Sequence, residues 1–105
     1  MNEITVEEIP DDAILLDVRE DAEFRAGHAE NAVHIPLGTI PVRVADLPKV
    51  EGTLPVICRS GGRSGQAVQW LAEQGHDVAN VVGGMGAWQA AGKAMVAESG
   101  TPEVL

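Results

Sequence analysis

The sequence at residues 56–64 is Val56-Ile57-Cys58-Arg59-Ser60-Gly61-Gly62-Arg63-Ser64. The apolar residues at its front predict the end of a buried strand, and the two glycines predict a tight loop. The residues from Gly62 to Ser64 predict the start of a helix. Cys58, the only cysteine of the chain, would therefore lie between the carboxyl end of a strand and the amino end of a helix. This arrangement is typical of ligand sites in α/β folds.

The loop after Cys58 is expected to be electropositive and rich in backbone donors. The chain has a formal net charge of -9, yet no Asp or Glu occurs between Gly52 and Ala72. Cationic neighbours and a helix amino end both lower the pKa of a thiol, and only the thiolate is a nucleophile. Glycines let the backbone curl so that successive N–H groups bind an anion. We therefore predict a reactive Cys58 that carries an anionic group, such as a persulfide sulfur or a phosphoryl group. The alternative is a small buried cysteine beside surface arginines.

Apolar runs and helical spacings alternate along the rest of the chain. They predict strands at residues 3–6, 13–18, 31–36, 54–57 and 77–82, and helices at residues 20–26, 37–47, 64–74 and 87–91. Five strands in alternation with helices indicate an α/β fold, with a mostly parallel five-stranded sheet and helices on both faces. Asp17 and Cys58 are both expected at carboxyl ends of strands. The residues from about Lys93 onward are expected to form a loose tail.

Length and composition limit the classes of protein to consider. A chain of 105 residues is expected to form one domain. An acidic chain lacks the basic face that nucleic-acid binding needs. No stretch has the length and apolarity of a membrane-spanning helix, and the first four residues show no signal-peptide pattern. A single cysteine excludes an internal disulfide and fits a reducing compartment, so we expect a cytoplasmic location.

The histidines, the glycine motifs and the surface pattern lead to three further expectations. His28, His34 and His76 do not have the spacing of metal ligands, so we expect no metal site. Gly84-Met85-Gly86 lacks the third glycine of a dinucleotide fingerprint, and Gly62-Arg63-Ser64 lacks the upstream glycine and the lysine of a phosphate-binding loop, so we expect no cofactor. The sequence shows no heptad repeat and no exposed apolar stripe, so we expect a monomer.

Four motifs along the chain carry a resemblance to a known family. They are Asp17-Val18-Arg19 followed by Glu23-Phe24; Gly27-His28 followed by Ala32-Val33-His34-Ile35-Pro36; the segment from Cys58 to Ser64; and Leu71-Ala72-Glu73-Gln74-Gly75-His76 followed by Val81-Val82-Gly83-Gly84-Met85-Gly86-Ala87-Trp88. From Ile4 to Gly92 the chain resembles the single-domain rhodanese (thiosulfate sulfurtransferase) homology domain. The resemblance implies a rhodanese-like domain at residues 1–92, followed by a C-terminal tail at residues 93–105.

The resemblance implies a sulfurtransferase that works through Cys58. The thiolate would take the outer sulfur of a small-molecule donor, thiosulfate or a persulfide, and become a persulfide. A thiol, cyanide or a protein acceptor would then remove that sulfur, in two covalent half-reactions. The loop that holds the persulfide would consist of Arg59, Ser60, Gly61, Gly62, Arg63 and Ser64. Asp17 and Arg19 are candidate neighbours of the site, and we expect them to form an ion pair or a cap that holds adjacent loops.

Three other functions stay open at this point. Phosphatases and arsenate reductases with related folds use Cys-x5-Arg around a tetrahedral anion, whereas Cys58 and Arg63 have the shorter Cys-x4-Arg spacing. A shorter loop suits a single sulfur better than a phosphate. Members of the family also serve as non-catalytic binding modules, usually after loss of the cysteine, which is present here. The third possibility is a sulfur relay that passes the persulfide sulfur to a partner protein.

Overall fold

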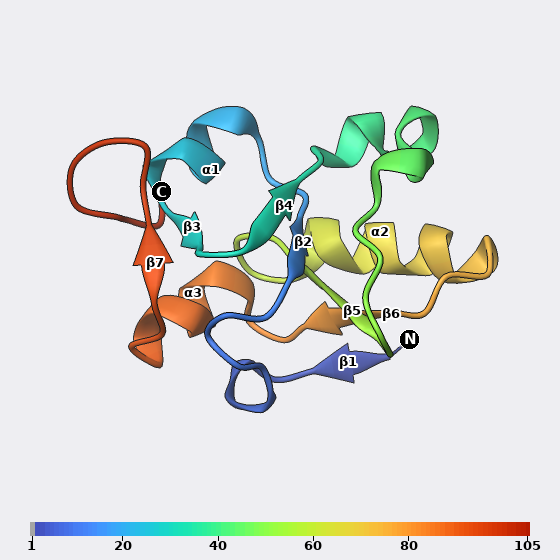
Figure 1. The fold of residues 1–105 in the computed structure, drawn as a ribbon, viewed down its shortest axis with the longest axis horizontal. Coiled ribbons are helices and arrows are strands. Elements are labelled where there is room, and N and C mark those ends of the chain that lie inside the picture. Colours follow the sequence, from blue (N-terminus) through green and yellow to red (C-terminus); the bar gives the residue numbers. More distant parts are fainter. Residues whose placement is uncertain (1) are drawn as a thin grey trace.

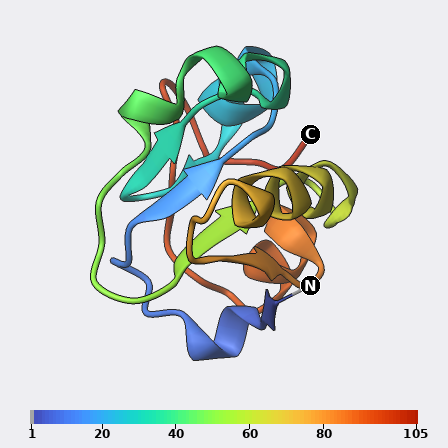
Figure 2. The same cartoon turned by 90° about the vertical axis from the view of Figure 1, so that its right-hand side faces the viewer.

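A five-stranded parallel sheet organises the chain in the computed structural model, which describes residues 2–105 (Figure 1). The strands lie in the order β1 (Glu3–Ile4), β6 (Val78–Val81), β5 (Leu54–Ile57), β2 (Leu15–Asp17) and β4 (Ala32–His34). Every neighbouring pair is parallel, and the arrows of the central strands point the same way in Figure 2. The predicted α/β fold with a parallel five-stranded sheet is confirmed.

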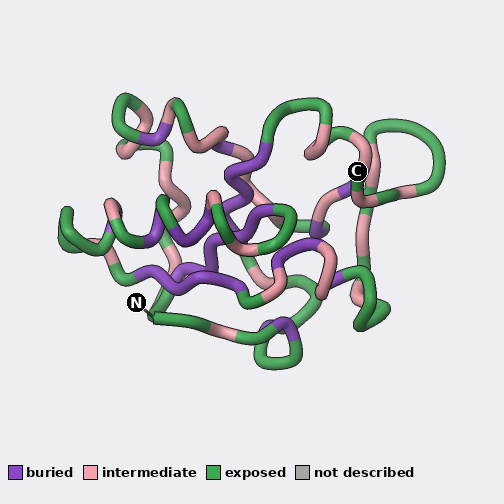
Figure 3. The backbone as a smooth tube through the Cα atoms, turned by 180° about the vertical axis from the view of Figure 1, so that it is seen from behind, coloured by how far each residue is buried: buried purple, intermediate pink, exposed green. Residues whose placement is uncertain are grey.

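Both faces of the sheet are covered, because successive residues of its central strands point to opposite sides. Leu16 and Val56 pack on one side with the inner residues of α2 (Gly62–Glu73). Leu15 and Ile57 pack on the other side, where α3 (Gly84–Ala90) contributes Met85 and Trp88. The buried residues, purple in Figure 3, follow these strands and the inner side of the helices. The predicted placement of helices on both faces is confirmed.

The short helix α1 (Asp21–Ala26) follows β2 at the carboxyl edge of the sheet. A capping box begins it, since the side chains of Glu20 and Glu23 each accept a hydrogen bond from the backbone of the other residue. The Phe24 ring stacks between the imidazoles of His28 and His34, with centroid distances of 3.8 Å and 4.4 Å. These stacked rings join α1 to β4 and keep α1 at this edge.

The prediction of a single helix at residues 37–47 is wrong. The structure has two 3-10 helices instead, η2 (Leu37–Val42) and η3 (Val44–Asp46). Pro41 has no backbone N–H, so an α-helix would lose one of its hydrogen bonds there. The i→i+3 bonds from the Thr39 N–H to the Pro36 carbonyl at 2.9 Å and from the Arg43 N–H to the Ile40 carbonyl at 3.0 Å lie on either side of Pro41 and do not need its nitrogen.

The segment after Lys93 is not a loose tail. Its strand β7 (Met95–Val96) pairs antiparallel with β3 (His28–Ala29). Farther along, the backbone N–H groups of Glu98 and Glu103 donate to the last carbonyls of α1. The segment returns along α1 toward the carboxyl edge of the sheet (Figure 1). The boundary after residue 92 stays a prediction, but the segment beyond it is ordered against the domain.

Two classes of feature are absent from residues 2–105. None of their helices combines the length and the apolar composition needed to cross a membrane. None of their His, Cys, Asp and Glu side chains gather in a group of three or more that could hold a metal ion.

Candidate active site

Cys58 lies directly after β5, where the chain leaves the sheet and turns into α2. The residue is 1% exposed. Gly61, which precedes α2, has a φ of 115°, in the left-handed region that favours glycine. This conformation lets the chain turn from the loop into α2, as the predicted strand–loop–helix arrangement requires.

The Cys58 sulfur accepts hydrogen bonds from the loop that follows it. The Gly61 N–H donates at 3.1 Å and the Ser64 hydroxyl at 3.2 Å. Burial raises the pKa of the Cys58 thiol, but bonds from the Ser64 hydroxyl and from the backbone of Ser64, Gly61 and Ser60 outweigh it. The net result is a pKa below the ordinary value, because these donors stabilise the thiolate. The site therefore favours the nucleophilic form of Cys58 chiefly through hydrogen bonds.

Replacing Ser64 with alanine is expected to move the titration of Cys58 to higher pH. The variant loses the largest of the interactions that lower the thiol pKa, so the thiolate needs a more alkaline solution to form. The measurement is the rate of iodoacetamide alkylation against pH, in which a lower pKa places the midpoint at lower pH. Ser60→Ala is the matched control, since it keeps the backbone N–H of residue 60. Equal midpoints for the wild type and Ser64→Ala would contradict the assignment.

Asn80 is a site residue that sequence reasoning missed. Its side-chain oxygen accepts a hydrogen bond from the Ser64 hydroxyl at 2.6 Å, and its amide nitrogen donates to the Gly61 carbonyl at 3.1 Å. A hydroxyl has one proton, so Ser64 donates it either to Asn80 or to Cys58. The available signal was one amide inside the apolar run of residues 78–82. A buried amide in a strand needs partners, and here they are loop groups beside the cysteine.

The first turn of α3 (Gly84–Ala90) binds the backbone carbonyls of Cys58 and Arg59. The Met85 N–H donates to the Cys58 carbonyl at 2.8 Å, and the Gly86 N–H donates to the Arg59 carbonyl at 3.1 Å. Gly84 has a φ of 55°, and a Cβ at that position would clash with the Cys58 carbonyl oxygen. The glycines at the start of α3 therefore serve close packing against the cysteine loop.

The neighbourhood of Cys58 is less positive than the sequence indicates. Arg63 forms a two-point ion pair with Glu23 of α1, at 2.7 Å and 2.9 Å. The hydrogen bonds from Arg63 are the main cause that lowers the pKa of Glu23 to about 2. The expected positive charge of the loop is partly neutralised, because the fold brings Glu23 to a loop that is distant in sequence.

The other loop arginine, Arg59, contacts the end of the described chain. Its Nε donates to the Leu105 carbonyl oxygen at 2.9 Å. One of its terminal nitrogens occupies the space that a Cβ on Gly86 would take. The side chain is exposed, and it lies along the first turn of α3.

Asp17 and Arg19 form a buried ion pair, as expected. Both side chains are 0% exposed, and the shortest of their contacts measures 2.7 Å. The Arg19 guanidinium also donates to the carbonyl of Gly27 at 2.8 Å and to that of Glu23 at 3.3 Å. The pair therefore joins the end of β2 to the interior of α1 and to the residue that follows it.

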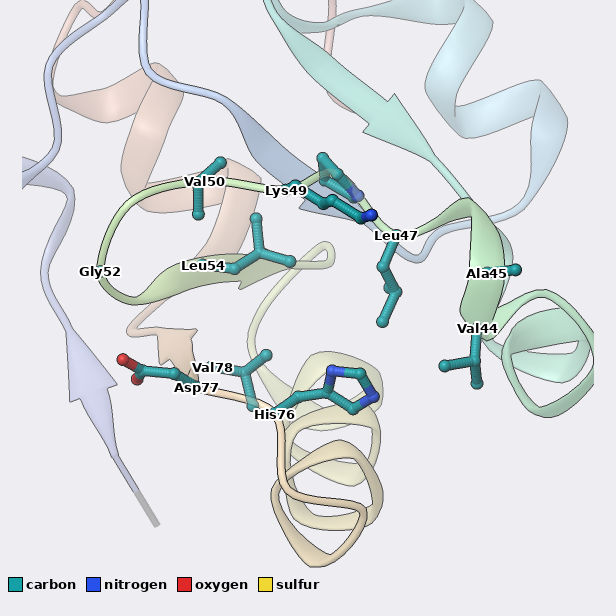
Figure 4. A pocket seen from close by; sticks show the side chains of 11 residues that line it. Val44, Ala45, Leu47, Lys49, Val50, Gly52, Leu54, His76, Asp77 and Val78 are labelled. Carbon is teal, nitrogen blue, oxygen red and sulfur yellow. The ribbon is translucent and has the colours of Figure 1, made fainter.

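An apolar hollow occurs at the other edge of the sheet, near the starts of β5 and β6 (Figure 4). Leu47, Leu54, His76 and Val78 are among the residues that line it. It contains no residue of the loop from Cys58 to Ser64. The hollow therefore does not take part in the chemistry at the cysteine.

Comparison with known proteins agrees with the fold. The model of the rhodanese-like domain matches residues 4–91. A sulfurtransferase of Allochromatium vinosum is 38% identical over 91 residues, which cover 86% of this chain and 84% of that protein. The protein YtwF of Bacillus subtilis is 44% identical over 82 residues, which cover 78% and 79% of the two chains. The crystal structure of a rhodanese-related protein from Thermoplasma volcanium superposes with a TM-score of 0.79 and 30% identity, covering 91% of this chain and 98% of that one. The chain belongs to the rhodanese-like domain family.

Proposed function

We propose that the protein transfers sulfane sulfur from thiosulfate or a similar small-molecule donor to a nucleophilic acceptor, through a persulfide on Cys58. In the first half-reaction the thiolate attacks the outer sulfur of the donor. A new S–S bond forms at Cys58, the donor's S–S bond breaks, and sulfite or a thiolate leaves with the bonding electrons. In the second, a thiol, cyanide or a protein acceptor takes that sulfur, and Cys58 leaves as a thiolate.

One observation carries the proposal: the sulfur of Cys58 accepts hydrogen bonds from the Gly61 N–H and the Ser64 hydroxyl. The same donors that stabilise a thiolate can stabilise the anionic outer sulfur of a persulfide. The short loop of residues 59–64 is consistent with the binding of a single sulfur atom. The membership in the family and the sulfurtransferase among the relatives support this chemistry.

Intact-protein mass spectrometry tests the proposal directly. After incubation with thiosulfate, the protein is expected to gain the mass of one sulfur atom and to lose it on addition of cyanide. The matched control is wild-type protein alkylated beforehand with iodoacetamide, because Cys58 is the only thiol that can react. Hydroxyethyl persulfide, generated in situ, serves as a second donor. No gain from either donor, in folded protein whose thiol still titrates, would contradict the proposal.

A further inference from the structure

The ion pair between Arg63 and Glu23 places a negative charge beside the cysteine loop. Two parallel hydrogen bonds, of 2.7 Å and 2.9 Å, join the guanidinium to the carboxylate. Two-point pairs of this kind fix geometry as well as charge. Their side chains are 34% and 19% exposed, so the pair borders solvent, from which a donor must approach.

Glu23 is held in place from its own helix as well as by Arg63. Its carboxylate accepts the Glu20 N–H at 3.0 Å, and its carbonyl oxygen accepts a bond from Arg19 at 3.3 Å. Arg19 is fixed in turn by its buried pair with Asp17. The carboxylate is ionised at neutral pH, since its pKa is about 2. It is thus a fixed negative charge and not a mobile surface group.

The charge of Arg63 acts on Cys58 and is offset by Glu23. Hydrogen bonds to Glu23 are the main cause that raises the pKa of Arg63, and the negative charge of Cys58 is a further cause. A donor that approaches the thiolate therefore meets Arg63 together with its carboxylate partner. The cost of bringing a negative donor to this site grows in proportion to the donor's charge.

We propose that Glu23 determines donor specificity, so that Cys58 prefers thiol persulfides, with one negative charge or none, over the dianion thiosulfate. This inference rests on the proposed function, since it concerns the same transfer to Cys58. With a protonated persulfide the balance is Cys–S⁻ + R–S–SH → Cys–S–SH + R–S⁻. With thiosulfate it is Cys–S⁻ + S–SO₃²⁻ → Cys–S–S⁻ + SO₃²⁻. Neither step needs an external oxidant or reductant. With thiosulfate, the thiolate and the donor together carry two more negative charges than with a protonated persulfide, and one more than with an ionised persulfide.

Glu23→Gln tests the inference, because glutamine keeps the length of the side chain and can still accept the Glu20 N–H. The variant is expected to increase kcat/KM for thiosulfate by about tenfold and kcat/KM for hydroxyethyl persulfide by less than about threefold. The difference arises because the repulsion that the Glu23 charge exerts on a donor is largest for the dianion. Asp21→Asn is the matched control. It removes one negative charge from the same helix, but Asp21 is 70% exposed and pairs with Arg25 instead of Arg63. The control is expected to leave both values within about twofold of wild type.

The outcomes separate this inference from the proposed function. Each rate constant is divided by that of the same donor with free cysteine, so that the donor's own reactivity cancels. If wild-type protein then uses thiosulfate better than hydroxyethyl persulfide, the inference is overturned, whatever the variants do. The same holds if Glu23→Gln leaves the ratio of the two donors unchanged or shifts it no more than Asp21→Asn does. If neither donor forms a Cys58 persulfide in wild-type protein, the proposed function itself fails.

Discussion

Replacement of Cys58 with serine is expected to lower kcat/KM for sulfur transfer by at least about a thousandfold. Both half-reactions pass through a bond to the cysteine sulfur, and a serine hydroxyl is a far weaker nucleophile at neutral pH. Cys58 is the only cysteine, so no second thiol can replace it. The measurement is the formation of thiocyanate from cyanide with each donor, at equal concentrations of wild type and variant.

The substitution is conservative enough for activity and folding to be distinguished. Serine is close to cysteine in size, and its oxygen can accept the Gly61 N–H that now bonds to sulfur. Circular dichroism and thermal unfolding are therefore expected to stay close to wild type. Sulfur transfer above the uncatalysed rate in folded Cys58→Ser protein would show that the sulfur does not travel on this residue.

Asp17→Asn is expected to lower the free energy of unfolding by about 3–5 kcal/mol. The change leaves the charge of Arg19 in a site where both side chains are 0% exposed, and removal of one partner of a buried pair leaves an uncompensated charge. Domains of this kind are stable by about 5–15 kcal/mol in total, so the loss is a large fraction. Urea unfolding followed by circular dichroism measures it.

The chain offers a matched control for this variant. Asp46 also pairs with an arginine, Arg43 at 3.0 Å, but these side chains are 56% and 41% exposed. Asp46→Asn is expected to cost less than about 0.5 kcal/mol, because solvent screens exposed pairs. Asp17→Leu combined with Arg19→Met should unfold at a higher urea concentration than Asp17→Asn alone, since no charge stays buried. Equal losses for Asp17→Asn and Asp46→Asn would contradict a structural role for the buried pair.

The core of the fold was predictable from local sequence. Residues 13–16 and 54–57 are continuous apolar runs, which indicate strands covered on both faces, and both strands lie inside the sheet and not at its edges. The pairing of β3 with β7 was not predictable in this way. Each strand has two residues, too few to show an alternation of apolar and polar side chains. Backbone hydrogen bonds also do not depend on the identity of the side chains, so the sequence does not reveal them. For the same reason, the sequence did not predict that the segment after Lys93 is ordered against the domain.

The candidate site was predictable only in part. The strand–loop–helix around Cys58 follows from its glycines and apolar residues, and the structure places the loop there. The partners that tune the loop come from elsewhere in the chain: Glu23 is 40 residues from Arg63, and Asn80 is 16 residues from Ser64. The absence of acids between Gly52 and Ala72 describes a stretch of sequence, whereas charge acts through space. Only the fold could show that a carboxylate reaches Arg63.

The contact between Arg59 and Leu105 matters for anyone who labels or immobilises this protein. A purification tag, fluorescent protein or surface linker joined after Leu105 would begin beside the cysteine loop, where it could obstruct donors. Asn2 directly precedes β1, which runs parallel to β6 toward the carboxyl edge of the sheet, so Asn2 lies at the starting end of that strand. Attachment at the amino end therefore leaves the approach to the cysteine open, and assays of sulfur transfer are best made with material prepared that way.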